Sequence, residues 1–204
     1  PHAIVAHSMG GHLLLRALAE RRIGADAVVL VAPMLGIYAG GLPRALGGGI
    51  AAAACALGHS RRPLWPARGR TPGEVEALRM RLTHSHERFE QEQAVRRARP
   101  DLAMDAPSWG WLRAAYRSIA QLERPGMVEA VRVPVLILAS KADRLVSAAA
   151  IARVARRLPH GRLHFYGGEA AHEILREVDP VRNDALARID AFLDEVAPPP
   201  EGRQ

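Results

Sequence analysis

Three side chains in this sequence have the types needed for nucleophilic catalysis by a serine: Ser8, Asp143 and His172. A serine hydroxyl attacks a carbonyl carbon when a neighbouring base takes its proton, and a histidine performs that task when a carboxylate fixes its tautomer. Each of the three residues follows a segment with the composition of a β-strand. Because the carboxyl ends of parallel strands meet at one edge of a sheet, these residues can lie together there. The sequence therefore predicts a catalytic triad with Ser8 as nucleophile, His172 as general base and Asp143 as the acid that orients it.

The residues around Ser8 predict the sharp turn that such a nucleophile requires. A short apolar run reaches Ala6-His7-Ser8-Met9-Gly10 and continues directly into a helical pattern, as expected for a strand, a turn and a helix. The elbow pattern G-x-S-x-G needs small residues two positions before and two positions after the serine, and Ala6 and Gly10 fill these positions. The backbone N–H of Met9, at the start of the helix, is the predicted first donor of an oxyanion hole.

Each triad candidate also has a purely structural alternative. A serine before a helix commonly caps it, and an aspartate after a strand commonly closes an Asx-turn, so Ser8 and Asp143 could have these roles alone. His172 is one of nine histidines. The competing bases are His12, one helical turn after Ser8, and His164, inside a predicted strand. The competing acids are Glu169 and Asp179.

The rest of the chain alternates between strand and helix patterns, which predicts an α/β fold with a parallel, doubly wound sheet. After the elbow, the predicted strands are Ala27–Val31, Val133–Ser140 and Leu163–Tyr166. The first two are the continuous apolar runs typical of buried parallel strands. The predicted helices are Met9–Arg21, Ser147–Leu158 with Ser147 as its N-cap, and Asn183–Val196.

Residues 34–127 have a different composition. Glycine and proline clusters, long charged helical patterns and the pair Trp109 and Trp111 occur there without an alternating strand pattern. We therefore expect a core formed by residues 1–33 and 128–197, a mainly helical cap inserted at 34–127, and a disordered tail at 198–204.

The overall composition is that of a folded globular chain. Of the 204 residues, 49% are hydrophobic and 24% are charged, and no apolar run is long enough to cross a membrane. The single Cys55 cannot form an internal disulfide, which fits a reducing, cytoplasmic location. No group of residues has metal-ligand spacing, so the sequence predicts neither a metal ion nor a cofactor.

The net charge of +7 lies mostly in the predicted cap, which holds 14 arginines against 8 acidic residues. Aromatic residues make up only 4% of the chain and no nucleic-acid-binding motif is present, so we expect no nucleic-acid partner. The arginines either form a solvated face or attract an anionic lipid surface. In the second case the protein would lie peripherally at the inner face of the membrane.

Four segments resemble the bacterial lysophospholipase branch of the monoacylglycerol-lipase-like α/β hydrolases: 6–11 (AHSMGG), 31–37 (VAPMLGI), 82–89 (LTHSHERF) and 171–175 (AHEIL). The chain order serine, aspartate, histidine is also that of an α/β-hydrolase triad. The resemblance runs over nearly the whole chain. It implies hydrolysis of a single-chain lipid ester, with a helical cap between the sixth and seventh strands of the family's sheet forming the acyl pocket.

The chain departs from that family at its N-terminal side. In an α/β hydrolase several strands precede the elbow strand, whereas here the elbow strand begins at once after Pro1. We therefore expect a C-terminal portion of a hydrolase with the last four strands and the cap, and a second oxyanion donor upstream of Pro1. The elbow strand would then be a bare sheet edge. We expect the 204 residues alone to be inactive or nearly so, and prone to self-association.

Two alternatives to a lipid esterase stay open. A peptidase or acyltransferase of the same fold would use the same triad beneath a different cap. A catalytically inactive fragment would bind anionic lipid through its basic cap.

Overall fold

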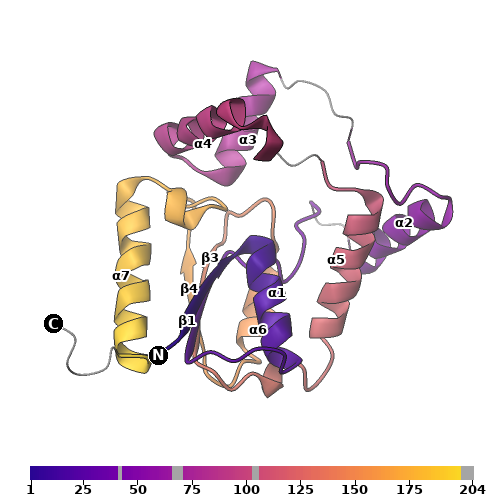
Figure 1. Ribbon diagram of the computed structural model, residues 1–204. Helices are drawn as coiled ribbons and strands as arrows, with labels where there is room; N and C mark the ends of the chain where they lie inside the picture. The colour runs from indigo at the N-terminus through magenta and orange to yellow at the C-terminus, as the bar shows by residue number, and fades with distance from the viewer. Residues whose placement is uncertain (41–42, 66–70, 103–105, 199–204) are drawn as a thin grey trace.

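A four-stranded parallel sheet forms the centre of the molecule, as a computed structural model describes it for residues 1–40, 43–65, 71–102 and 106–198 (Figure 1). The strands are β1 (Ala3–His7), β2 (Ala27–Val31), β3 (Val135–Ser140) and β4 (Gly161–Tyr166). They lie side by side in this order, and every pairing is parallel. The predicted α/β fold with a partial parallel sheet is confirmed.

The two inner strands form the buried centre of the sheet. Every residue of β2 and of β3 is buried, as expected for strands covered on both faces. β1 lies at one edge of the sheet, and its residues alternate between exposed and half-buried positions, with Val5 49% exposed. β4 forms the opposite edge.

Helices cover both faces of this sheet (Figure 1). α1 (Ser8–Ala19) and α6 (Ala148–Ala155) pack on one face, and α7 (Asp179–Val196) packs on the other. The predicted N-cap of α6 is confirmed, since the Ser147 side chain accepts a hydrogen bond from the Ala150 amide. α7 begins at Asp179 and not at the predicted Asn183, because Pro180 occupies the first turn, where a missing N–H costs no hydrogen bond.

Residues 34–127, hereafter the cap segment, are mainly helical where the structure describes them. Their helices are α2 (Arg44–Ala56), α3 (Pro72–Leu82), α4 (His86–Ala98), the short 3-10 helix η1 (Pro100–Leu102) and α5 (Trp109–Leu122). Figure 1 shows α3 and α4 above the sheet, and α5 beside α1 with α2 packed against it. Two further 3-10 helices are η2 (Val128–Ala130) and η3 (Ile174–Arg176). The predicted disordered tail lies outside the described residues from position 199 onward.

The contact between α2 and α5 depends on a glycine. A Cβ atom added at Gly47 would lie 2.4 Å from the hydroxyl oxygen of Tyr116 on α5. The glycine run 47–49 lies inside α2. Because Gly47 has no side chain, α5 can approach α2 closely at this point. Among the described helices, none combines the length and the apolar character needed to cross a bilayer.

Candidate active site

Ser8 lies at the junction of β1 and α1 in a left-handed backbone conformation, with a φ angle of 52°. A residue with a side chain rarely adopts this conformation, because its Cβ then crowds the neighbouring carbonyl group. The strand must end and the helix must begin within one residue, and the strain is concentrated there. His7, and not Ser8, occupies the N-cap position of α1, so Ser8 does not have the capping role considered as an alternative.

The two glycines after the turn differ in the space around them. Among the described residues, a Cβ at Gly10 would meet no atom within 4 Å, whereas a Cβ at Gly11 would lie 3.1 Å from the Cβ of Pro33. A side chain at Gly11 would therefore crowd the turn after β2, whereas the described residues leave space beside Gly10. The turn after β2 also contacts the elbow, because the Met34 amide donates to the Ser8 carbonyl at 2.9 Å.

The structure brings the three predicted triad residues together. His172 lies in the loop after β4, and its Nε2 atom is 2.9 Å from Oγ of Ser8. Its Nδ1 atom is 2.7 Å from Oδ2 of Asp143. Asp143 and His172 are only 4% and 3% exposed, so their contact is shielded from water. The histidine thus stands between the hydroxyl and the carboxylate, as proton transfer from a serine requires.

Asp143 makes the contacts expected for both of the roles that the sequence offers as alternatives. Its Oδ1 atom accepts hydrogen bonds from the amides of Leu145 at 2.7 Å and Val146 at 2.9 Å, which closes the turn after β3. Its other oxygen faces His172. The turn therefore fixes the orientation of the carboxylate toward the histidine.

The competing residues have contacts elsewhere. His12 is buried against α5, with Nε2 2.6 Å from Oγ of Ser118, and burial lowers its pKa to about 4. The ring of His164 packs against the ring of Tyr166 within β4. The two competing acids also have partners of their own, since Glu169 accepts from the Gly167 amide and Asp179 pairs with Arg88.

His7 is part of the site in a way that the sequence did not indicate. Its ring centroid is 4.8 Å from that of His172, and its Nε2 atom is 3.3 Å from the His172 carbonyl oxygen. Burial, followed by the charge of His172, lowers the pKa of the His7 imidazole. A neutral His7 would not repel the positive charge that His172 would acquire if it acted as a base. The sequence identifies His7 only as an elbow residue, and its position between Ala6 and Ser8 gives no sign of this contact.

Ser140, the last residue of β3, links the turn that contains Asp143 to residues 167–176, hereafter the histidine loop. Its hydroxyl lies 2.5 Å from the carbonyl oxygen of Ala170 and accepts from the Ala142 amide at 3.0 Å. Ser140 is fully buried. A polar residue that ends a buried strand is the only sequence signal for this role.

A cavity of about 410 Å³ adjoins the elbow. It is lined by His7, by Glu92 of α4, and by Glu173, Leu175 and Arg176 of the histidine loop. Arg176 donates hydrogen bonds to both carboxylates, so their charges are partly compensated. Burial raises the pKa of Glu173. In the described part of the chain, no three side chains of the metal-binding types are grouped to hold an ion.

A parallel sheet covered by helices on both faces, with a serine at a strained strand-to-helix turn, defines the class of the α/β hydrolases. The family model described as "Serine aminopeptidase, S33" (Hydrolase_4) matches residues 1–179, and the chain belongs to this family. The resemblance to lysophospholipases and monoacylglycerol lipases is also confirmed at the level of the family.

Known relatives cover the chain to different extents. A probable lysophospholipase L2 of Haemophilus influenzae is 25% identical over 113 residues, which are 55% of this chain and 35% of that protein. The crystal structure of the Paleococcus ferrophilus monoacylglycerol lipase has a TM-score of 0.68 at 20% identity, over 94% of this chain and 68% of that one. A soluble variant of the monoglyceride lipase of Saccharomyces cerevisiae, bound to a substrate analogue, has a TM-score of 0.69 at 18% identity, over 95% of this chain and 64% of that one.

The TM-scores show that the chain shares its fold with the solved structures, and at these identities the similarity concerns the fold alone. The matched region spans about a third of the length of the curated relative and about two thirds of the solved chains.

Proposed function

We propose that this chain carries the catalytic triad of a serine ester hydrolase that acts on lysophospholipids or monoacylglycerols. The line of contacts from Oγ of Ser8 through the imidazole of His172 to the carboxylate of Asp143 supports this proposal most directly. The substrate class is supported by the relatives, which are a probable lysophospholipase and two monoacylglycerol lipases.

In the first half of the proposed reaction, Ser8 Oγ attacks the ester carbonyl carbon while Nε2 of His172 takes the hydroxyl proton. The carbonyl oxygen becomes an oxyanion. The amide of Met9 would donate to it, because the first N–H groups of a helix have no partner within the helix and lie at its positive end. When the tetrahedral intermediate collapses, the alcohol leaves with the proton held by His172 and the acyl group stays on Ser8.

In the second half, water attacks the acyl-enzyme ester. His172 takes a proton from the water and returns one to Ser8 Oγ as the fatty acid leaves. Asp143 stabilises the charged imidazole in both halves without taking a proton itself. We further propose that the cap segment lies over the acyl chain and selects it.

A peptidase is the second candidate, because the matched family model is described as a serine aminopeptidase. An aminopeptidase must bind the charged α-amino group of its substrate, and Glu92 and Glu173 supply carboxylates in the cavity beside His7. Arg176 pairs with both, which weakens their attraction for an ammonium group.

A substrate panel separates the two candidates. We expect the full-length protein to hydrolyse lysophospholipids and monoacylglycerols with a kcat/KM at least about a hundredfold above that for aminoacyl anilides, since the pocket must supply an apolar surface for one acyl chain. The measurement is kcat/KM for matched acyl chain lengths beside a set of aminoacyl anilides. A preference for the anilides would establish the peptidase. Hydrolysis of neither class, together with no labelling by a fluorophosphonate, would leave the inactive lipid-binding alternative.

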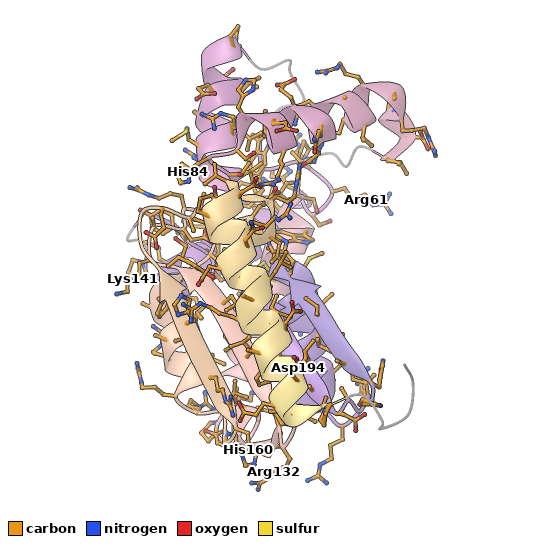
Figure 2. The ribbon with its side chains drawn as sticks, turned by 90° about the vertical axis from the view of Figure 1, so that its left-hand side faces the viewer. Arg61, His84, Arg132, Lys141, His160 and Asp194 are labelled. Atoms are coloured by element: carbon orange, nitrogen blue, oxygen red, sulfur yellow. The ribbon has the colours of Figure 1, made fainter. Side chains whose placement is uncertain are left out.

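We also propose that the basic cap segment attracts an anionic lipid surface. Arg61 and Arg62 are exposed in the turn after α2, and Figure 2 shows Arg61 extending away from the ribbon. On α2 itself, Leu46 and Ile50 are exposed, so an apolar surface lies on the neighbouring helix. Arg68 and Arg70, which belong to the same basic stretch of sequence, lie outside the described residues.

The double variant R61E/R62E should bind vesicles of anionic lipid about 10- to 30-fold more weakly than the unaltered protein, at about 1 kcal/mol for each basic residue near the surface. The difference should shrink as salt rises, because screening over roughly 8 Å at physiological ionic strength weakens the attraction. Vesicle co-sedimentation at several salt concentrations measures both effects.

The matched control is R132E/R156E, which changes the net charge equally. Arg132 and Arg156 are exposed, and Figure 2 shows Arg132 at the end of the molecule away from Arg61. Equal loss of binding in both double variants would mean that net charge, and not the cap segment, determines the affinity.

A further inference from the structure

Glu177, directly after η3, has a fully buried carboxylate that bridges the cap segment and the histidine loop. Its Oε1 atom lies 3.0 Å from Nδ1 of His84 and accepts from the Ala171 amide at 2.8 Å. Its Oε2 atom accepts from the His84 amide at 2.9 Å and from the Val178 amide at 3.3 Å. A carboxylate only accepts, so its contact with His84 is a hydrogen bond when Nδ1 is the nitrogen that carries the proton. A buried carboxylate is costly unless such donors surround it, and this one has two donors on each oxygen.

Residues 81–85 of the cap segment meet residues 171–177 along a boundary that we call the seam. Hydrogen bonds across this seam also hold the main chain of His172 and of its neighbours. The amide of His172 donates to the carbonyl of Arg81 at 3.3 Å, and the amide of Glu173 donates to the carbonyl of Leu82 at 2.7 Å. Together with the bond from Ala171 to Glu177, three consecutive amides centred on His172 are bound across this seam. Figure 2 shows His84 where the cap segment meets the end of α7.

Glu177 is not needed as a catalytic group, because Asp143 already contacts His172. Its carboxylate instead joins the amide that precedes His172 to a histidine of the cap segment, 93 residues away in sequence from Glu177. The Thr83 hydroxyl strengthens the same junction by donating to the carbonyl of Arg176 at 2.7 Å.

We propose that Glu177 is a positioning residue that sets the place of His172 opposite Ser8 and couples this place to the cap segment. The inference rests on the proposed function for its catalytic consequence. A shift of the segment 81–85 would be transmitted through the seam to the main chain of His172. The contact between Nε2 and the Ser8 hydroxyl at 2.9 Å would then change with the position of the cap segment.

The test uses E177Q, which keeps the size of the side chain. Each carboxylate oxygen accepts from two donors, so either orientation of the glutamine amide turns an NH₂ group toward two N–H groups. We expect the maximal rate of Ser8 labelling by a fluorophosphonate to fall about 10- to 100-fold, as small misplacements of catalytic groups do, with the reagent's binding constant changed less than about threefold. We also expect faster hydrogen exchange at the amides of 171–173 and of His84 together.

Two further variants complete the test in the full-length protein. E195Q on α7, which alters an exposed carboxylate paired with Arg162 of β4, should change neither readout. H84A removes one hydrogen-bond donor to Glu177, and the altered side chain is 30% exposed. We expect smaller effects in the same direction as those of E177Q, and this variant can be measured even if E177Q does not fold.

An unchanged labelling rate in folded E177Q and H84A would overturn the proposal, and so would faster exchange confined to residues 82–85. Failure of the unaltered protein to react with the fluorophosphonate would instead refute the proposed function. Hydrogen exchange at 171–173 would still decide whether Glu177 holds the histidine loop.

Discussion

Ser8→Ala in the full-length protein is expected to abolish ester hydrolysis and fluorophosphonate labelling while the fold persists. Only a hydroxyl is lost, and its contact in the structure is with His172. Loss of the nucleophile of a serine triad costs about a millionfold in kcat in a well-studied protease. Steady-state turnover measures the loss, and circular dichroism shows whether the fold is kept. Residual turnover above about a thousandth of the original rate would argue against Ser8 as the nucleophile.

Ser8→Gly supplies the control for backbone strain. It should be as inactive as Ser8→Ala, because neither variant has a hydroxyl. Glycine adopts the φ of 52° at little cost, whereas alanine retains the crowding of a Cβ, at about 1–2 kcal/mol. The glycine variant should therefore unfold at the higher temperature in a thermal melt. A melting temperature equal to or below that of the alanine variant would mean that the turn at Ser8 is not strained.

Asp143→Asn should lower kcat about 10⁴-fold, the loss seen when the same change is made in a serine protease triad. The asparagine oxygen can still accept from Leu145 and Val146, so the turn and the fold should survive. Its NH₂ group would face Nδ1 of His172 and leave the proton on Nε2. An imidazole with Nε2 protonated cannot take the proton of Ser8. Turnover of a short ester, measured beside a thermal melt, tests both parts.

Removal of the competing carboxylates is the control for this assignment. Glu169→Gln and Asp179→Asn should change kcat less than about threefold, since Glu169 bonds to the Gly167 amide and Asp179 to Arg88. If either variant were more damaging than Asp143→Asn, then Asp143 would not be the acid of the triad.

The sequence was informative where structure is local. β2 and β3 were predicted because strands covered on both faces must be apolar throughout, and both are buried at every position. The turn at Ser8 was predicted because strand, small residues and helix follow one another within a few positions. The edge of the sheet at which Ser8, Asp143 and His172 meet followed from the parallel order of the strands.

The remainder depends on contacts between distant segments, which one sequence does not reveal. The packing of His7 on His172 joins residues 165 positions apart, and the bond from His12 to Ser118 joins residues 106 positions apart. Both histidines look like ordinary helix or turn residues in the sequence. The tight space at Gly11 is a further case, because the atom that limits it belongs to Pro33 of another turn.

The carbonyls of Arg81 and Leu82 affect the design of chimeras in which the cap segment is exchanged between related proteins. They bind the amides of His172 and Glu173, and the Met34 amide binds the carbonyl of Ser8. Residues 34–127 are therefore joined to residues of the proposed triad, or to their neighbours, at their beginning and again near their middle. A chimera that exchanges this segment for that of a relative would transfer part of the support of His172 along with the proposed acyl pocket. Substrate preference and catalytic rate should then be inherited together, unless the graft leaves residues 81–85 in place.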